Sequence, residues 1–169
     1  RSLFFSGASK DAIIAFETLE SQFAPNNMKP SNLMLYHLNK GYYELSKYHG
    51  EEALQHFELS DSLLQSLFKG DHVLELELIP LIVETTYRYK PKGKMLDYIY
   101  LKNKEASALL SRNPDWIVYS RQFLLWKGHT SFIQRTRDAG IDSLKMAMEL
   151  SRIYAPWETA FLIRAYAEL

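Results

Sequence analysis

Cysteine is absent from the 169 residues of this chain, and its absence removes several kinds of chemistry at once. Disulfide frameworks, thiolate nucleophiles and zinc sites built on cysteine are all excluded. Net charge is absent as well, because 20 basic residues balance 20 acidic ones, so no overall field draws the chain to nucleic acid or to an anionic membrane. We expect a cytoplasmic protein, since a chain without cysteine suits a reducing compartment.

Long apolar runs are also missing. The longest, residues 78–83, falls far short of the roughly 20 residues that cross a bilayer, and the first residues are too few for a secretion signal. The sequence contains no glycine-rich phosphate loop, no G-x-S-x-G elbow and no His-Glu-x-x-His pattern. Neither Asn-Gly hairpin signals nor sustained alternation indicates strands. We therefore expect an all-α protein that is not an enzyme and that uses no cofactor, metal or membrane.

What the sequence does contain is helical periodicity, interrupted at regular distances. The interruptions at Pro25, Gly70, Pro114 and Pro156 are separated by 45, 44 and 42 residues. A fixed period of this length is typical of a solenoid of stacked helical units. We expect one helical-repeat domain over 1–169, with repeats at 1–25, 31–70, 71–113 and 115–156 and the start of another at 157–169. The chain does not begin with methionine, and it ends in an apolar helical pattern without a stop signal, so a segment of a longer protein is expected.

The individual helices follow from the same periodicity. They are predicted over 9–24, 32–48, 51–69, 72–89, 94–112, 115–136 and 139–154, with an eighth starting at residue 156. Ser9 and Ser31 are the predicted N-caps, and Gly70 is the predicted left-handed stop. Pro80 is expected to kink or split its helix. The helix from residue 115 either continues to 136 or breaks at Gly128.

Small and larger side chains recur at a fixed spacing in three of these helices. A small residue followed four positions later by a larger one allows two helices to approach closely. The triads are Ala12, Phe16 and Leu19; Ala53, Phe57 and Ser60; and Ser143, Ala147 and Leu150.

Residues 38–57 combine a leucine–small pair, a tyrosine and, after the break at His49-Gly50, an alanine–aromatic pair. This stretch resembles a tetratricopeptide repeat (TPR), and the resemblance is clearest over 32–69 and looser over the remainder of the chain. The closing stretch 147–160 resembles the longer, divergent repeats of large signalling regulators. The resemblance implies a right-handed α–α superhelix that binds other proteins. Lys40 stands where the chaperone-binding members carry an asparagine that clasps a C-terminal carboxylate, so that mode is not expected here. A HEAT- or armadillo-type solenoid, with its period of about 40–47 residues, is the structural alternative.

The resemblance also implies a binding groove lined by the first helix of each pair. The groove-facing positions carried over onto 32–48 are Leu33, Tyr36, Lys40, Tyr43 and Glu44, and Arg121 is a further candidate. Tyrosine suits a peptide groove because it joins a large apolar face to a hydroxyl group. The alternative interpretation is that Tyr36 and Tyr43 are ordinary packing residues between helices.

Other polar residues are interpreted structurally. The five histidines are expected at surfaces and turns, and the carboxylates, among them Glu51, Glu75 and Asp138, as helix-cap charges and solvated faces. The basic run 88–94 is interpreted as solvated lysines at a helix end and turn, with phosphate or nucleic-acid contact as the alternative. Trp116 and Trp157, 41 residues apart, are expected to pack at equivalent repeat positions.

Together these features predict a non-enzymatic scaffold that binds a protein or peptide within a larger regulatory protein, with no nucleic-acid partner for this segment. A ligand- or peptide-sensing domain of a transcriptional or nucleotide-dependent regulator is the alternative. An all-helical enzyme fragment is a third interpretation, which would need titratable groups converging in a closed pocket. A homodimer formed through a terminal helix is also compatible with the pattern.

Overall fold

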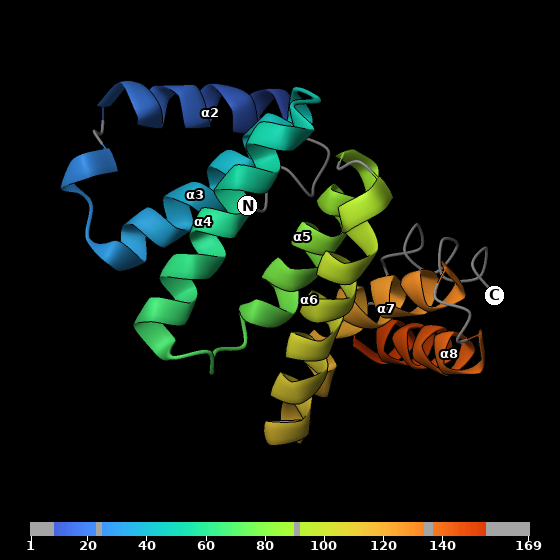
Figure 1. The fold of residues 1–169 in the computed structure, drawn as a ribbon. Helices are drawn as coiled ribbons and strands as arrows, with labels where there is room; N and C mark the ends of the chain where they lie inside the picture. Colours follow the sequence, from blue (N-terminus) through green and yellow to red (C-terminus); the bar gives the residue numbers. More distant parts are fainter. Residues whose placement is uncertain (1–8, 23–24, 90–91, 134–136, 155–169) are drawn as a thin grey trace. The chain divides into compact units, whose positions relative to one another are not determined.

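A computed structural model of the chain describes residues 9–22, 25–89, 92–133 and 137–154. Over these ranges the secondary structure is helical and contains no strand, which confirms the all-α class (Figure 1). The chain divides into two compact units. Unit 1 comprises Arg1–His72 with Thr85–Pro91, and unit 2 comprises Val73–Glu84 with Lys92–Leu169. The organisation as one repeat domain over 1–169 stays a prediction.

Unit 1 contains a helical hairpin, one further helix and, at residues 85–89, the end of a helix that begins in unit 2. Its complete elements are α2 (Ser9–Gln22), the 3-10 turn η1 (Pro25–Asn27), α3 (Pro30–Ser46) and α4 (Gly50–Phe68). Pro30 is the first residue of α3, where its missing N–H costs nothing, and extended Lys29 precedes it. The prediction that Ser31 caps this helix was therefore wrong. Ser9 likewise lies inside α2 instead of ahead of it.

The predicted breaks in unit 1 lie one or two residues away from where the sequence suggested them. Tyr48, with φ 63°, makes the turn between α3 and α4, whereas Gly50 is already the first residue of α4. At the other end of α4 the left-handed conformation begins at Lys69, with φ 55°, and continues through Gly70, with φ 70°. Gly70 therefore belongs to the helix stop, as predicted, but it does not form that stop alone.

The hairpin of α3 and α4 is held by close approach. A Cβ built on Gly41 would lie only 2.4 Å from Cε1 of Phe57, so α3 packs directly onto this ring. Ala53 and Phe57 are fully buried, and Ser60 Oγ donates a 3.0 Å hydrogen bond to the Met34 carbonyl of α3. The central small–aromatic triad is confirmed by this packing. The triad of α2 is confirmed only in part, because Phe16 is buried but Leu19 is 40% exposed.

Helix α5 (Glu75–Tyr89) runs through Pro80 as one helix, so the expected split was wrong. Proline at position 80 removes a hydrogen bond only to the carbonyl of Leu76, at the start of the helix. Buried apolar side chains on both sides of the proline, including Ile79 and Ile82, hold the helix in place.

Unit 2 also contains α6 (Lys92–Arg112), the 3-10 helix η2 (Pro114–Tyr119), α7 (Arg121–Ile133) and α8 (Arg137–Tyr154). The helix predicted over 115–136 is divided at Ser120, where the Oγ and the N–H both donate to the Ile117 carbonyl at 2.6 and 3.0 Å. It does not break at Gly128. Instead, Gly128 lets α8 approach α7, since a Cβ there would meet Leu144 Cγ at 2.5 Å.

The core of unit 2 is one cluster of buried apolar side chains drawn from α5, α6, α7 and α8. Its members are Leu76, Ile79, Val83, Met95, Ile99, Ala106, Leu109, Phe123, Leu124, Leu125, Trp126, Leu144, Ala147 and Met148, with Trp116 and Leu150 packed against it. Ala147 and Leu150 of the third triad thus pack as predicted, and Trp116 packs against the core. The equivalence of Trp116 and Trp157 stays a prediction, because Trp157 lies outside the described residues. Within the described ranges no helix has the length and apolarity that a membrane crossing requires.

Candidate interaction site on α3

Four side chains form a stripe along α3 and its C-cap, and we call Tyr36, Lys40, Tyr43 and the C-cap residue Lys47 the α3 stripe. They follow one another at intervals of four, three and four residues, which places them on a single helical face. The stripe contains the same unit twice, a tyrosine followed four residues later by a lysine. Helix α2 lies across this face (Figure 1).

Each tyrosine–lysine unit holds one carboxylate of α2. Oε1 of Glu20 accepts a 2.7 Å hydrogen bond from the Tyr36 hydroxyl, and Oε2 forms a 2.8 Å ion pair with Lys40 Nζ. The second carboxylate, Glu17, accepts from Tyr43 Oη at 2.9 Å and from Lys47 Nζ at 3.1 Å. Charge-assisted bonds of this kind are stronger and more directional than those between neutral groups.

An aromatic anchor lies between the two units. The ring of Phe16 is 5.8 Å from that of Tyr36 and 5.1 Å from that of Tyr43, measured between centroids, and the side chain is only 6% exposed. Lys40 Nζ lies 4.4 Å from the centroid of Tyr43 and 5.4 Å from that of Phe16. The ammonium group thus contacts aromatic faces as well as carboxylates, which adds cation–π attraction.

Glu44 supports the stripe from the α3 side. Its carboxylate is 3.3 Å from Lys40 Nζ and 2.9 Å from Nδ1 of His49, and the residue is buried. Burial raises the pKa of Glu44, but the hydrogen bonds from His49 and Lys40 outweigh burial, so the pKa lies below its usual value. Burial lowers the pKa of Lys40, and the two neighbouring carboxylates raise it by more. Both groups are therefore ionised at neutral pH.

Burial, followed by the carboxylate of Glu20, raises the pKa of the Tyr36 hydroxyl far above its usual value. Tyr36 consequently keeps its proton and acts as a donor to Glu20. The arrangement as a whole presents two neutral donors and two cations toward α2, and it can recognise anions that are correctly spaced.

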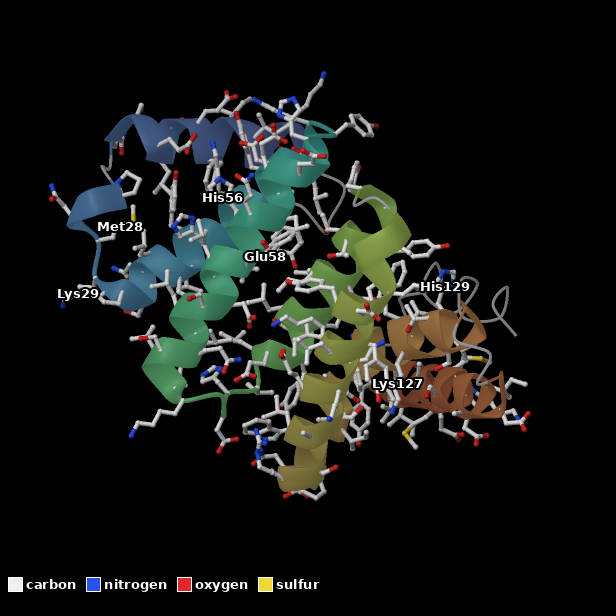
Figure 2. All side chains as sticks on the ribbon, in the orientation of Figure 1. Met28, Lys29, His56, Glu58, Lys127 and His129 are labelled. Carbon is white, nitrogen blue, oxygen red and sulfur yellow. The ribbon has the colours of Figure 1, made fainter. Side chains whose placement is uncertain are left out.

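A histidine pair borders the stripe. Nδ1 of His37 on α3 lies 3.0 Å from Nδ1 of His56 on α4, and the two rings stack with their centroids 5.1 Å apart. Figure 2 labels His56 on α4. Both side chains are half-buried. Burial, followed by the mutual influence of the pair, lowers the pKa of His37, and burial, followed by Lys40, lowers that of His56. The prediction that these two histidines occupy surfaces or turns was wrong, because they pack between helices.

The structure brings together four of the six predicted groove residues. Tyr36, Lys40, Tyr43 and Glu44 form one connected cluster, while Leu33 is half-buried on the same helix. Arg121 belongs to unit 2, where it is the first residue of α7. The two tyrosines pack between helices, as the alternative interpretation holds, and α2 covers the face on which they lie.

Sequence reasoning missed the partners of this cluster. Lys47 continues the spacing of the stripe by one further step, and the second tyrosine–lysine unit was therefore visible in the sequence. Phe16, Glu17 and Glu20 lie on a different helix, so no local spacing connects them to α3. Their contacts with the stripe span 16 to 30 residues along the chain.

Several charged residues lie at helix ends, as predicted. Glu51, Glu75 and Asp138 lie in the first turns of their helices, and Arg88 lies in the last turn of α5. Such positions complement the helix dipole. Glu75 is nevertheless buried and does not lie on a solvated face. In the basic run 88–94, residues 90 and 91 lie outside the described residues, and Lys92 and Gly93 open α6 instead of forming a turn.

Among the residues that the structure describes, no three histidine or acidic side chains converge as metal ligands would. Comparison of the chain with protein-family models, with curated proteins and with solved structures gave no match.

Proposed function

We propose that the chain is a non-enzymatic scaffold of TPR-like helical repeats, which binds a protein or peptide partner as part of a regulatory protein. The observation that carries the proposal is the α3 stripe, because its two tyrosine–lysine units and the aromatic surface between them hold a helix. A helix laid onto an aromatic and charged face of another helix is a recurring mode of peptide recognition. In the stripe the aromatic rings provide apolar area, and the lysines fix the register.

The repeat architecture is supported by the packing within each unit. Gly41 against Phe57 and Gly128 against Leu144 are two close approaches of consecutive helices, each made possible by a missing side chain. A stack of such hairpins presents its first helices on one surface, which is how a solenoid builds an extended binding face.

Selection from a displayed library of amphipathic helical peptides tests the proposal. Peptides that bind the chain are expected to lose at least tenfold in affinity for the double variant Tyr36→Ala, Lys40→Glu, a loss of about 1.4 kcal/mol. The matched control is Tyr100→Ala, Lys104→Glu on α6, which removes the same two residue types at the same spacing from exposed positions. Circular dichroism establishes that both variants are folded. Equal affinity of the selected peptides for the wild type and for the Tyr36, Lys40 variant would refute the assignment of this face.

A further inference from the structure

We propose that the α3 stripe recognises a partner helix that carries a phenylalanine and two carboxylates on one face, and that α2 is an exchangeable occupant which this partner displaces. The inference rests on the proposed function and specifies the chemistry of its partner. Helix α2 supplies the recognition pattern, with Phe16 and Glu17 adjacent and Glu20 one turn further on.

The pattern of α2 matches the stripe point for point. The two tyrosine–lysine units start seven residues apart, at Tyr36 and Tyr43, and each takes one of the two carboxylates. The phenylalanine fills the space between the two tyrosine rings. A helix with neutral side chains at the two acidic positions would leave the half-buried Lys40 with Glu44 as its only carboxylate partner among the contacts described. Such a helix is disfavoured, because a desolvated cation that loses a partner is costly.

The α2 contact is weaker than the hairpin beside it. Among the α2 side chains that the structure describes, only Phe16 is buried, while Ile14 is 61% exposed and Leu19 is 40% exposed. Helices α3 and α4, in contrast, share fully buried Ala53 and Phe57. Among the described side chains of α2, Phe16 is therefore the main apolar anchor, with half-buried Ile13 three residues before it.

The polar part of the contact is open to competition. The side chains of Lys47 and Glu17 are 36% and 51% exposed, and those of Lys40 and Glu20 are 15% and 29% exposed. The more exposed Lys47–Glu17 pair contributes little net stability and is screened by salt, whereas the more enclosed Lys40–Glu20 pair is screened less. Both pairs discriminate between partners by charge and position. The α2 contact thus combines selectivity with modest strength, which is the combination that an exchangeable helix requires.

Displacement follows mass action. A partner can bind only those molecules in which α2 has left the stripe. Its apparent affinity is therefore its intrinsic affinity multiplied by the fraction of such molecules. Weakening α2 without changing α3 raises this fraction and should tighten partner binding. A contact that merely stabilised the fold would not show this gain.

The experiment measures binding of a fluorescein-labelled synthetic peptide with the sequence of residues 9–22 to the full chain by fluorescence anisotropy. We compare the wild type with Phe16→Ala, which removes the anchor of α2 and leaves the stripe intact. The Phe16→Ala chain is expected to bind the peptide about tenfold more tightly than the wild type, because its own α2 competes less. A second peptide carries Glu17→Gln and Glu20→Gln, and it is expected to bind about tenfold more weakly than the first.

A charge exchange keeps the test independent of folding defects. Lys40→Glu in the Phe16→Ala chain should abolish binding of the original peptide, and a peptide with Glu20→Lys should restore it. Restoration shows that the variant is folded and that residues 20 and 40 meet in the complex. Raising the salt concentration should weaken binding of the original peptide to the Phe16→Ala chain more than it weakens binding of the Glu17→Gln, Glu20→Gln peptide to the same chain.

The outcomes separate the inference from the function on which it rests. If the peptide does not bind to the folded Phe16→Ala chain, both the inference and the proposed binding function of this face are overturned. Binding that is equally tight for the acidic and the neutral peptide would overturn the inference and leave a helix-binding face. Equal affinity of the wild type and the Phe16→Ala chain would show that α2 does not compete. Concentration-dependent dimers of the wild type that the Phe16→Ala change abolishes would assign the face to exchange of α2 between copies, which overturns the proposal of a separate partner.

Discussion

Replacing Gly41 with alanine tests the close packing of α3 on α4. In an ordinary helix this change is favourable by about 0.5–1 kcal/mol, because glycine loses more backbone freedom on folding than alanine does. At position 41, however, the added Cβ would lie 2.4, 2.6 and 2.9 Å from three atoms of the Phe57 ring. Unstrained carbon contacts lie at about 3.5–4.0 Å, so the ring has to move by about 1 Å.

The size of the effect follows from the surroundings of Phe57. The ring is fully buried, so it cannot move without displacing other core side chains. Inserting a methyl group into a packed core costs about 1–3 kcal/mol, and an overlap with three ring atoms belongs near the upper limit. After the favourable helix term is subtracted, Gly41→Ala should lower the free energy of unfolding by about 2 kcal/mol. For a chain of this length that corresponds to a decrease in Tm of about 4–8 °C.

Thermal and urea unfolding followed by circular dichroism at 222 nm measures the change. A double-mutant cycle with Phe57→Leu isolates its cause, because leucine lacks the ring atoms that the new Cβ would meet. In the Phe57→Leu background Gly41→Ala should be neutral or stabilising, which gives a coupling energy of about 2–3 kcal/mol. An increase in Tm of the single variant Gly41→Ala, or a coupling energy near zero, would refute the packing argument.

Three further changes test other contacts. Gly50→Ala should destabilise the protein by about 2 kcal/mol or more, because its Cβ would lie 2.1–2.3 Å from three ring atoms of Tyr89, and Tyr89→Ala should remove this sensitivity. Gly128→Ala should lower the urea midpoint of tryptophan fluorescence, since all three tryptophans belong to unit 2; an unchanged midpoint would contradict the close approach of α7 and α8. Burial lowers the pKa values of His37 and His56, so the unfolded chain, with histidine pKa values of about 6.5, binds more protons than the folded chain below neutral pH. Stability measured in urea should therefore fall as the pH drops from about 7 through 6.5 and below, and His56→Gln should reduce this slope; a slope that the variant leaves unchanged would assign the pH dependence to other groups.

The helices could be predicted from the sequence wherever the signal was local. Apolar periodicity gave α3 and α4 to within a few residues, and the small residues at Ala53 and Gly41 indicated helices that approach closely. Errors arose where local rules compete. Serine at position 31 was preferred as a cap, but proline at position 30 fits the first helical position better and moves the helix start toward it.

Two glycines show why glycine is ambiguous in a sequence. Gly50 was predicted to be part of a break and a break at Gly128 was one of two alternatives, because glycine is common where helices end. In the structure Gly50 is the first residue of α4 and Gly128 lies inside α7, and the ring of Tyr89 and the side chain of Leu144 approach their backbone. A glycine that admits a distant side chain and a glycine that turns the chain look alike in sequence. The difference is decided by residues 39 and 16 positions away, which no local pattern reports.

The candidate site shows the same division between local and distant information. The helix and the face of Tyr36, Lys40 and Tyr43 could be predicted, because their spacing lies within one helix. The sequence did not predict that α2 covers this face, because several amphipathic helices could pack there. A charge argument would have narrowed the choice: two tyrosine–lysine units seven residues apart require two carboxylates close together, and Glu17 and Glu20 provide them.

The two contacts of α3 divide its roles. Toward α4 the helix presents Gly41 and the apolar side chains that pack with Phe57, a contact that tolerates no change of partner because its fit is steric. Toward α2 it presents hydroxyl and ammonium groups. The fit of these groups to a partner depends on charge and spacing, so any helix with the correct acidic pattern can bond to them. A helix whose only role was to continue a stack would gain more from an apolar surface on both sides. The polar face of α3 therefore favours recognition as its role, and it makes the charge exchange between residues 20 and 40 the most discriminating measurement on this protein.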